Sequence, residues 1–142
     1  MIIPMVARSV RDPFDREGWL LELKWDGFRA IAETDGQGAV KLHSRNQNDF
    51  KKRFSPIVEA FAELKRPAVP DGEIVVGGHP RFEWLLNRGP QKSTLVYYVF
   101  DLLSLDGKGL RQLRLLTRKV RLHRLLKNPQ RLIYVDHIER RG

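Results

Sequence analysis

The sequence of 142 residues contains no cysteine, which excludes disulfide bonds and thiolate metal sites and is consistent with a cytoplasmic protein. It also lacks an uninterrupted apolar run long enough to cross a membrane. Its four histidines are scattered, without the spacing of metal ligands. Pro4 and Arg8 interrupt the first ten residues, and this is not the pattern of an export signal. The absences therefore favour a cytoplasmic protein that is neither membrane-spanning nor stabilised by disulfide bonds or thiolate-bound metal.

Acidic residues are scarce relative to basic ones. Lys and Arg number 26 against 17 Asp and Glu, which gives a net charge of +9. From Leu105 to Lys127 there are eight basic residues and a single acid, Asp106. A field of this sign attracts polyanions such as nucleic acid, although a solvated basic surface would have the same composition. No repeat, low-complexity segment or linker divides the chain, so residues 1–142 are interpreted as one domain.

Short apolar segments and helical spacing of apolar residues predict the secondary structure. Strands are expected at 19–25, 28–34, 39–44, 73–78, 94–105 and 131–138. The strands at 28–34 and 39–44 are expected to form a hairpin, because Gly36 and Gly38 between them can take the positive φ of its turn. Helices are expected at 56–65, with Ser55 as N-cap, and at 81–88 and 117–128. In the last of these, Val120, Leu122, Leu125 and Leu126 are expected to face the core, opposite Arg114, Arg118 and Arg121. Strands dominate without strict βαβ order, which predicts an α+β fold with a largely antiparallel sheet.

The stretch LELKWDGFRA, residues 21–30, places Lys24 at the end of an apolar strand. A lysine there is costly unless it is exposed, paired or reactive. Asp26-Gly27 is typical of a tight turn, and the glycine would let the backbone approach a ligand closely. Arg29 offers a planar guanidinium suited to phosphate or ribose hydroxyls. On these residues alone, a hairpin turn with a surface lysine is the favoured interpretation.

Three further segments reverse that preference. KWDGFR (24–29) resembles the K-x-D-G-x-R signature of ATP-dependent DNA ligases and mRNA capping enzymes. SRNQNDF (44–50), DGEIVV (71–76) and YYVFDLL (97–103) are similar to later elements of that superfamily, in the same order. The residues of these segments most resemble the ligase domain of bacterial non-homologous end-joining ligases. The resemblance extends from about Pro4 to the C-terminus. The resemblance implies a partial adenylation (nucleotidyltransferase) domain of the ATP-grasp-like DNA ligase type, with largely antiparallel strands and flanking helices.

The resemblance also implies roles for the residues around Lys24. The lysine at this position attacks the α-phosphorus of ATP and forms lysyl-AMP, the first step of DNA strand joining in repair. The attack requires a neutral amine, which partial burial and neighbouring cations favour. Glu22 matches the glutamate that reads the adenine amino group, with a cross-strand salt bridge as the alternative. Arg29 matches the arginine near the ribose and phosphate.

Later elements add further nucleotide contacts by the same resemblance. Arg45 matches an arginine near the nucleotide sugar and the 5′-phosphate of nicked DNA, and its neighbours Ser44 and Asn46 suit a turn equally well. Glu73 matches the glutamate that holds a ribose hydroxyl or a metal water, and a solvent-facing strand end is the alternative. Phe100 matches the aromatic that stacks on adenine, although a Phe in so apolar a strand is also typical of core. The implied cofactors are ATP and Mg²⁺ or Mn²⁺.

The family suggests no catalytic role for the basic segment 108–127. Phosphate-backbone contacts by Arg114, Arg118 and Arg121 are one hypothesis, and a solvated helix face is the other. The expected partner is nicked or broken double-stranded DNA, in a nucleoid-associated protein of the bacterial cytoplasm.

Two elements of a complete adenylation domain do not occur in these 142 residues: E-G-x-V, whose acid binds metal, and K-x-K, whose lysines hold the triphosphate. Nor is there an OB-fold domain. The expectation is a C-terminally truncated domain with impaired activity. The alternatives are a non-catalytic relic that binds nucleic acid or a partner, one half of a split ligase completed by a partner chain or end-joining proteins, and a capping-type guanylyltransferase.

Overall fold

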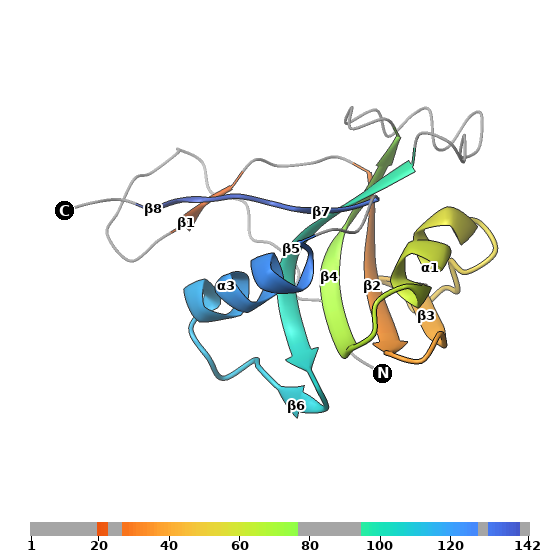
Figure 1. Ribbon diagram of the computed structural model, residues 1–142. Coiled ribbons are helices and arrows are strands. Elements are labelled where there is room, and N and C mark those ends of the chain that lie inside the picture. Colours follow the sequence, from red (N-terminus) through yellow and green to blue (C-terminus); the bar gives the residue numbers. More distant parts are fainter. Residues whose placement is uncertain (1–19, 23–26, 77–94, 128–130, 140–142) are drawn as a thin grey trace.

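A computed structural model of the chain describes residues 20–22, 27–76, 95–127 and 131–139. Their centre is a sheet in the order β3-β2-β4-β5-β6, with β7 also paired to β5 (Figure 1). All its pairings are antiparallel except that of β7 with β5. The strands are β2 (Phe28–Asp35), β3 (Val40–Ser44), β4 (Pro67–Val76), β5 (Leu95–Leu105), β6 (Lys108–Gly109) and β7 (Leu132–Tyr134). The predicted α+β fold with a largely antiparallel sheet is confirmed.

Strand β5 is the long apolar strand expected at 94–105, and it is central because β4 pairs along one edge while β6 and β7 share the other. The predicted β2–β3 hairpin also forms. Its turn uses Gly36 and Gly38, whose φ angles are 75° and 102°. Asp35 closes the turn by accepting hydrogen bonds from the N–H groups of Gln37 and Ala39, at 2.7 and 3.0 Å.

One face of the sheet carries the main hydrophobic core. Helix α1 (Ser55–Ala62) and its N-cap place Phe54, Ile57 and Phe61 against this face, and all three are fully buried. Tyr97 meets Phe61 edge-on at 5.4 Å and donates its hydroxyl to the carbonyl of Ala30. The predicted N-cap is wrong: Phe54 occupies that position and no side chain caps the helix, so Ser55 is the first helical residue. Pro56 is at the second position, where its missing N–H breaks no helical hydrogen bond.

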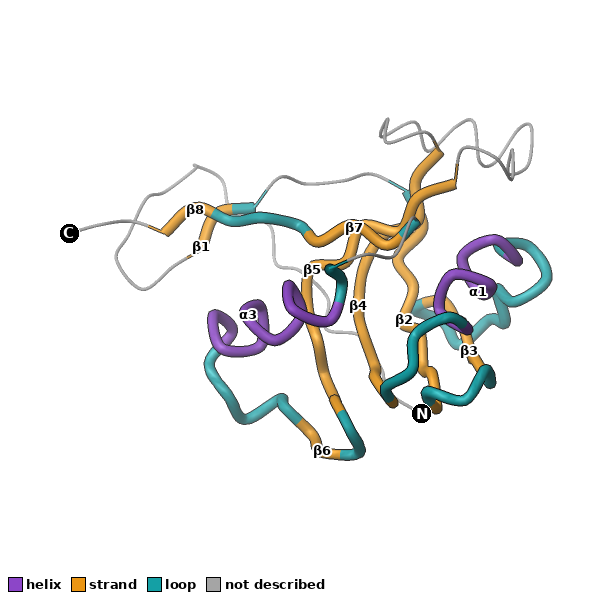
Figure 2. The backbone as a smooth tube through the Cα atoms, viewed as in Figure 1, coloured by secondary structure: helices purple, strands orange, loops and turns teal. Residues whose placement is uncertain are grey.

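Helix α3 (Leu115–Leu125) connects β6 to β7 and packs beside β5 (Figure 2). Its predicted faces need correction. Val120 is 44% exposed, whereas Lys119 is fully buried beside Leu122 and Leu126. Helical spacing from Leu115 gives 119, 122 and 126 as the inward positions, so a lysine occupies a core position and Val120 points outward.

A separate two-stranded ladder joins β1 (Leu20–Leu21) to β8 (Ile138–Glu139). The buried strand predicted for 19–25 is therefore only two residues long in the described part, and Leu20 is half-buried. Lys24 and the helix predicted at 81–88 lie outside the described residues. In the described segments, no helix combines the length and the hydropathy needed to span a membrane.

Candidate functional site

Three of the predicted nucleotide-binding residues meet on the sheet face opposite α1. Arg29 of β2 pairs in register with Glu73 of β4, so the two side chains project from the same face. The guanidinium carbon of Arg29 lies 5.3 Å from the centre of the Phe100 ring of β5. We call the surface formed by Arg29, Asp71, Glu73 and Phe100 the polar face. It brings together a planar cation, carboxylates and an aromatic ring from three adjacent strands.

Asp71 holds Arg29 in place. Nε and Nη2 of Arg29 donate to the two carboxylate oxygens of Asp71 at 3.1 and 2.6 Å, a bidentate arrangement. Burial acts to lower the pKa of Arg29, but the hydrogen bond and charge of Asp71 raise it above its ordinary value. Burial raises the pKa of Asp71, although Arg29 opposes the effect. The guanidinium is thus permanently charged and fixed in orientation.

A β-bulge sets the position of Phe100. Gly72 pairs with Val99 and Asp71 with Asp101, so Phe100 is the extra residue of β5. Bulges re-aim side chains locally, and here the bulge follows Tyr98 and precedes Asp101. Phe100 is half-buried and packs beside the small cluster of Val75, Tyr98 and Val135. The ring is therefore partly accessible on the polar face, not enclosed in the main core.

Asp101 lies in an apolar strand and has a structural partner on α3. Its oxygens accept from Nε and Nη2 of Arg118 at 2.9 and 3.3 Å, and from the N–H of Leu102 at 2.8 Å. Arg118 also donates to the carbonyl of Leu113 at 2.8 Å. Arg118 is consequently not part of a solvated face with Arg114 and Arg121; it ties α3 to the bulge beside Phe100.

Gly27 and Gly72, the glycines of KWDGFR and DGEIVV, are required by strand packing. A Cβ on Gly27 would overlap the carbonyl oxygen of Ile74 in β4. A Cβ on Gly72 would overlap the carbonyl of Tyr98 and lie 2.7 Å from the Tyr97 ring. Gly27 was expected to permit close approach to a ligand, and in this structure the group that approaches it is the neighbouring strand.

Glu22 forms a salt bridge to helix α3, whereas the alternative considered from the sequence was a salt bridge between strands. Its carboxylate accepts from Nζ of Lys119, which also donates to the carbonyl of Val135 at 2.8 Å and lies 5.0 Å from the Tyr134 ring centre. Lys119 is fully buried, whereas the Glu22 side chain is 26% exposed. The residue two positions before Lys24 is thereby attached to α3.

The other predicted site residues lie further apart. Arg45 is exposed in the turn after β3, and it follows Ser44, whose partner in β2 is Ala30, next to Arg29. Ser44 acts as a turn residue, with its Oγ accepting from the N–H of Asn48 at 3.0 Å. Arg114 precedes α3 as its N-cap, and Arg121 is exposed on the helix. None of these three arginines belongs to the polar face.

No set of three or more His, Cys, Asp or Glu side chains is grouped to hold a metal ion within the described segments. Mg²⁺ does not require such a set, because it commonly binds one or two carboxylates together with substrate phosphates. Glu73, opposite Arg29 on the polar face, is a carboxylate suited to that arrangement.

Sequence reasoning missed Asp71 and Lys119. Asp71 was visible as the acid that precedes Gly72, two residues before Glu73, which is the spacing of one strand face. Lys119 was signalled by its spacing from Leu115 and Leu122, but its charge argued against a core position.

Residues 4–141 match the ATP dependent DNA ligase domain family. The chain belongs to this family. The prophage-derived DNA ligase-like protein LigB of Bacillus subtilis is 34% identical over 131 residues, which are 87% of this chain and 47% of LigB. The multifunctional non-homologous end joining protein LigD of Pseudomonas aeruginosa is 35% identical over 88% of this chain and 15% of its own length. The chain thus spans about half of one of these ligase relatives and a small part of the other.

Solved structures of this family share the fold. The ligase domain of Mycobacterium tuberculosis LigD is 37% identical, with a TM-score of 0.70 over 84% of this chain and 39% of that one. Mycobacterial DNA ligase D complexed with ATP and MES is 33% identical, with a TM-score of 0.69 over 83% and 39%. The resemblance to bacterial end-joining ligases is confirmed, and the relatives are ATP-dependent DNA ligases, which are nucleotidyltransferases.

Proposed function

We propose that this chain, as a single adenylation domain, binds ATP on the polar face and transfers AMP to Lys24. The observation that carries the proposal is the meeting of Arg29, Glu73 and Phe100 on one sheet face in a member of the DNA ligase family. A solved relative with ATP bound supports the choice of nucleotide. The reaction would be the first step of DNA strand joining in the bacterial cytoplasm, near the nucleoid.

The proposed step is a substitution at the α-phosphorus. Nζ of Lys24 forms a bond to phosphorus, the bond from phosphorus to the bridging oxygen breaks, and pyrophosphate leaves. The amine gives up its proton to solvent, so the product is a neutral phosphoramidate nitrogen. A positively charged group near the α-phosphate stabilises charge that develops on the transferred phosphoryl group.

The residues of the polar face have distinct roles in this proposal. Phe100 stacks on the adenine, and Arg29, held by Asp71, is directed at the ribose and α-phosphate. Glu73 would accept from a ribose hydroxyl or help to hold Mg²⁺. When bound, Mg²⁺ would neutralise charge on the phosphates. Glu22 holds the segment before Lys24 through Lys119, and reading the adenine amino group would require it to leave that partner.

The test is formation of a covalent AMP adduct with α-labelled ATP and Mg²⁺. The wild-type chain should become labelled, Lys24→Ala should not, and Lys41→Ala should match wild type because Lys41 is an exposed lysine of β3. Labelling should be slow, since E-G-x-V and K-x-K are absent from these 142 residues. GTP in place of ATP should give no label.

Two results would contradict the proposal. Absence of any label at high protein concentration would exclude adenylation by this chain and favour a binding role or a split enzyme. Label that persists in Lys24→Ala would show that the nucleophile is another residue.

A further inference from the structure

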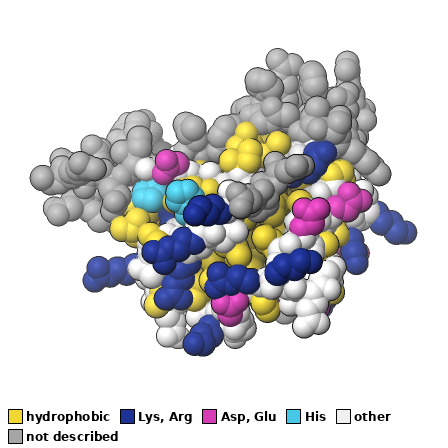
Figure 3. Space-filling view, viewed as in Figure 1, with side chains coloured by type: hydrophobic (Ala, Val, Ile, Leu, Met, Phe, Trp, Pro, Cys, Tyr) yellow, Lys and Arg dark blue, Asp and Glu magenta, His cyan; other side chains and the backbone are white. Residues whose placement is uncertain are grey.

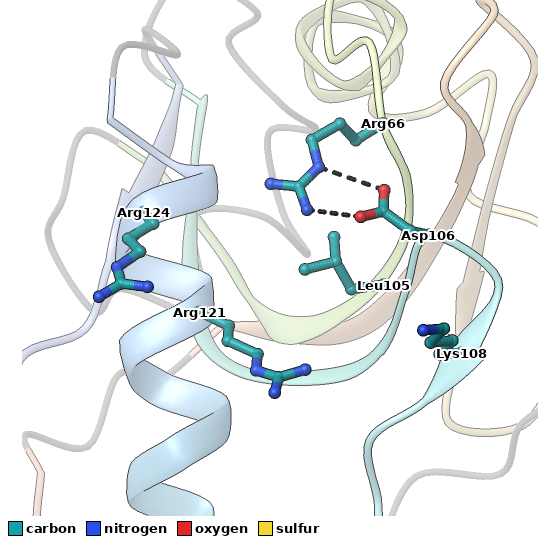
Figure 4. A pocket seen from close by; sticks show the side chains of 6 residues that line it. All are labelled: Arg66, Leu105, Asp106, Lys108, Arg121 and Arg124. Atoms are coloured by element: carbon teal, nitrogen blue, oxygen red, sulfur yellow. Dashed lines mark hydrogen bonds and ion pairs between the residues drawn. The ribbon is translucent and has the colours of Figure 1, made fainter.

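Two arginine–aspartate pairs involve β5 or the turn that follows it, and they differ in burial. Arg66 and Asp106 form a bidentate pair at the edge of a hollow between α3 and the β5–β6 hairpin (Figure 4). Both of these side chains are 49% exposed. Arg118 and Asp101 form the other pair, and their side chains are only 16% and 17% exposed. Lys and Arg side chains lie on the surface in the region of α3 (Figure 3), so burial separates Arg118 from exposed neighbours such as Arg121.

Asp101 lies directly opposite Asp71 of β4 in the strand register. Opposed residues of neighbouring strands project from the same face of a sheet, and like charges in that arrangement repel each other. Burial raises the pKa of Asp71, and the charge of Asp101 adds to the effect. Two carboxylates at this position therefore need two cations. Arg29 from β2 provides one, and Arg118 from α3 provides the other.

Arg118 directs the carboxylate of Asp101 toward α3. Its Nε and Nη2 donate to the two oxygens of Asp101, while Nη1 donates to the carbonyl of Leu113 at 2.8 Å. Without Arg118, the largely buried carboxylate next to Phe100 would have to find another cation or take up a proton. The cation already present on this face is Arg29, which Asp71 holds. The pairing on α3 thus bears directly on the polar face.

We propose that Arg118 is a positioning residue of the nucleotide site: by neutralising Asp101, it leaves Asp71 to hold Arg29 and keeps Phe100 turned toward the adenine. The claim rests on the proposed function, because it requires that Arg29 and Phe100 contact ATP. Arg118 itself touches no nucleotide and acts through Asp101. This role replaces the DNA contact considered for Arg118, because its Nε, Nη1 and Nη2 all donate to protein groups.

The test measures ATP affinity and AMP transfer in full-length variants. Arg118→Met removes the charge and keeps an unbranched side chain, and Arg118→Met with Asp101→Asn removes both charges of the pair. Arg66→Met is the matched control, because it breaks the exposed bidentate pair with Asp106. The Kd for ATP is measured by isothermal titration calorimetry in a Lys24→Ala background, which excludes the proposed adduct. AMP transfer is measured with Lys24 intact, and circular dichroism verifies that each variant is folded.

Arg118→Met should raise the Kd for ATP at least about tenfold, because the unpaired Asp101 then competes with Asp71 for Arg29. The labelling rate at saturating ATP should also fall, since Arg29 is directed at the α-phosphate. Arg66→Met should keep the Kd within about twofold of wild type, because an exposed ion pair contributes little. A purely stabilising role of Arg118 would lower the folded fraction and leave the Kd of the folded protein unchanged.

Rescue distinguishes the charge of Asp101 from a mechanical tie to α3. Adding Asp101→Asn to Arg118→Met should return the Kd for ATP to within about threefold of wild type, because no unpaired carboxylate remains. The amide oxygen of Asn can still accept from the N–H of Leu102, as Asp101 does. Arg118→Lys should raise the Kd about threefold, since it keeps the charge but loses the bidentate fork. This variant provides the measurement if Arg118→Met does not fold.

Three results would overturn the positioning role: a Kd in Arg118→Met no higher than in Arg66→Met, a double variant as weak as Arg118→Met, or an unchanged Kd in Arg118→Lys. An AMP adduct on Lys24 that forms equally well in these variants contradicts only the positioning role. ATP affinity that depends on Arg118, without any adduct, contradicts only the transfer step of the proposed function. Absence of ATP binding by wild type contradicts both.

Discussion

Lys119 is fully buried because three groups surround its ammonium. The Glu22 carboxylate and the Val135 carbonyl accept from it, and the Tyr134 ring lies 5.0 Å away. A buried ammonium is tolerated only with such partners. Tyr134 in turn stacks on His123 at 4.5 Å, so α3, β7 and the segment before Lys24 meet around one lysine. The predicted nucleotide-site residue Glu22 is therefore part of a structural contact.

Removing one member of this pair should destabilise the fold. Glu22→Gln should lower the free energy of unfolding by about 2 kcal/mol, less than for a fully buried pair because Glu22 is partly exposed. In a double-mutant cycle with Lys119→Met, urea unfolding should give a coupling energy above about 1 kcal/mol.

The surface pair Arg66–Asp106, in which both side chains are 49% exposed, is the matched control. Its coupling should not exceed about 1 kcal/mol. A coupling for Glu22–Lys119 no larger than that of Arg66–Asp106 would contradict the structural role of the buried lysine.

At the residue scale, sequence patterns identified the candidate site residues better than the residues that pair with them. Arg29, Glu73 and Phe100 were selected by resemblance, and the structure brings them together. Asp71 and Lys119 were missed because their roles depend on residues 42 and 97 positions away in the chain. No local pattern contains such a separation.

Strands β2 and β4 approach each other closely at Gly27. A side chain there would overlap the Ile74 carbonyl, and backbone cannot move away without breaking the ladder. Gly27→Ala should therefore cost at least about 2 kcal/mol of unfolding free energy, or prevent folding.

The control for this variant is Gly109→Ala in β6, where an added Cβ meets nothing within 4 Å. It should change the stability by no more than about 0.5 kcal/mol in chemical denaturation. Equal stability of the two variants would contradict the close approach of β2 and β4 at Gly27.

Tyr97 gives the sheet a pH dependence. Burial raises its pKa well above the ordinary value, and the charges of Asp71 and Glu73 act in the same direction. The stability that Tyr97 contributes should be fully present below about pH 10, which is its pKa in the unfolded chain. It should decline as the pH rises toward the higher pKa of Tyr97 in the folded protein. Urea unfolding above pH 10 should show a steeper loss of stability in wild type than in Tyr97→Phe.

Tyr97→Phe should also cost about 1–2 kcal/mol at neutral pH, because the Ala30 carbonyl loses its hydroxyl donor. Tyr98 is less enclosed, and burial also raises its pKa. Tyr98→Phe should therefore alter the loss of stability above pH 10 less than Tyr97→Phe does. Identical alkaline slopes in wild type and Tyr97→Phe would contradict this assignment.

At the element scale, strands with clear apolar content and turns with glycine were predictable, including the β2–β3 hairpin and β5. The β5–β6 hairpin was not predicted, although Asp106-Gly107 carried the signal. Both residues have positive φ, 53° and 80°, as a tight hairpin turn requires. The bulge at Phe100 had no signal, because it depends on which residues of β4 lie opposite.

At the scale of the whole molecule, the two faces of the main sheet carry different kinds of residue. The side against α1 supplies the core, and the other side presents the polar face of Arg29, Asp71, Glu73 and Phe100. Residues 105–127, which include α3 and the β5–β6 turn, carry eight basic residues and one acid beside the same central strand. Composition predicted a polyanion partner, but only the fold separates paired arginines such as Arg118 from exposed ones such as Arg121.

Peptide mapping by tandem mass spectrometry after incubation with ATP and Mg²⁺ tests the central claim most directly. The proposed function predicts AMP on the peptide that contains Lys24, attached to its Nζ, and no modification of the peptides that contain Lys41 or Lys119. AMP attached to any other lysine, or no AMP on any peptide of the intact chain, would contradict the assignment of an adenylate-forming site to the polar face.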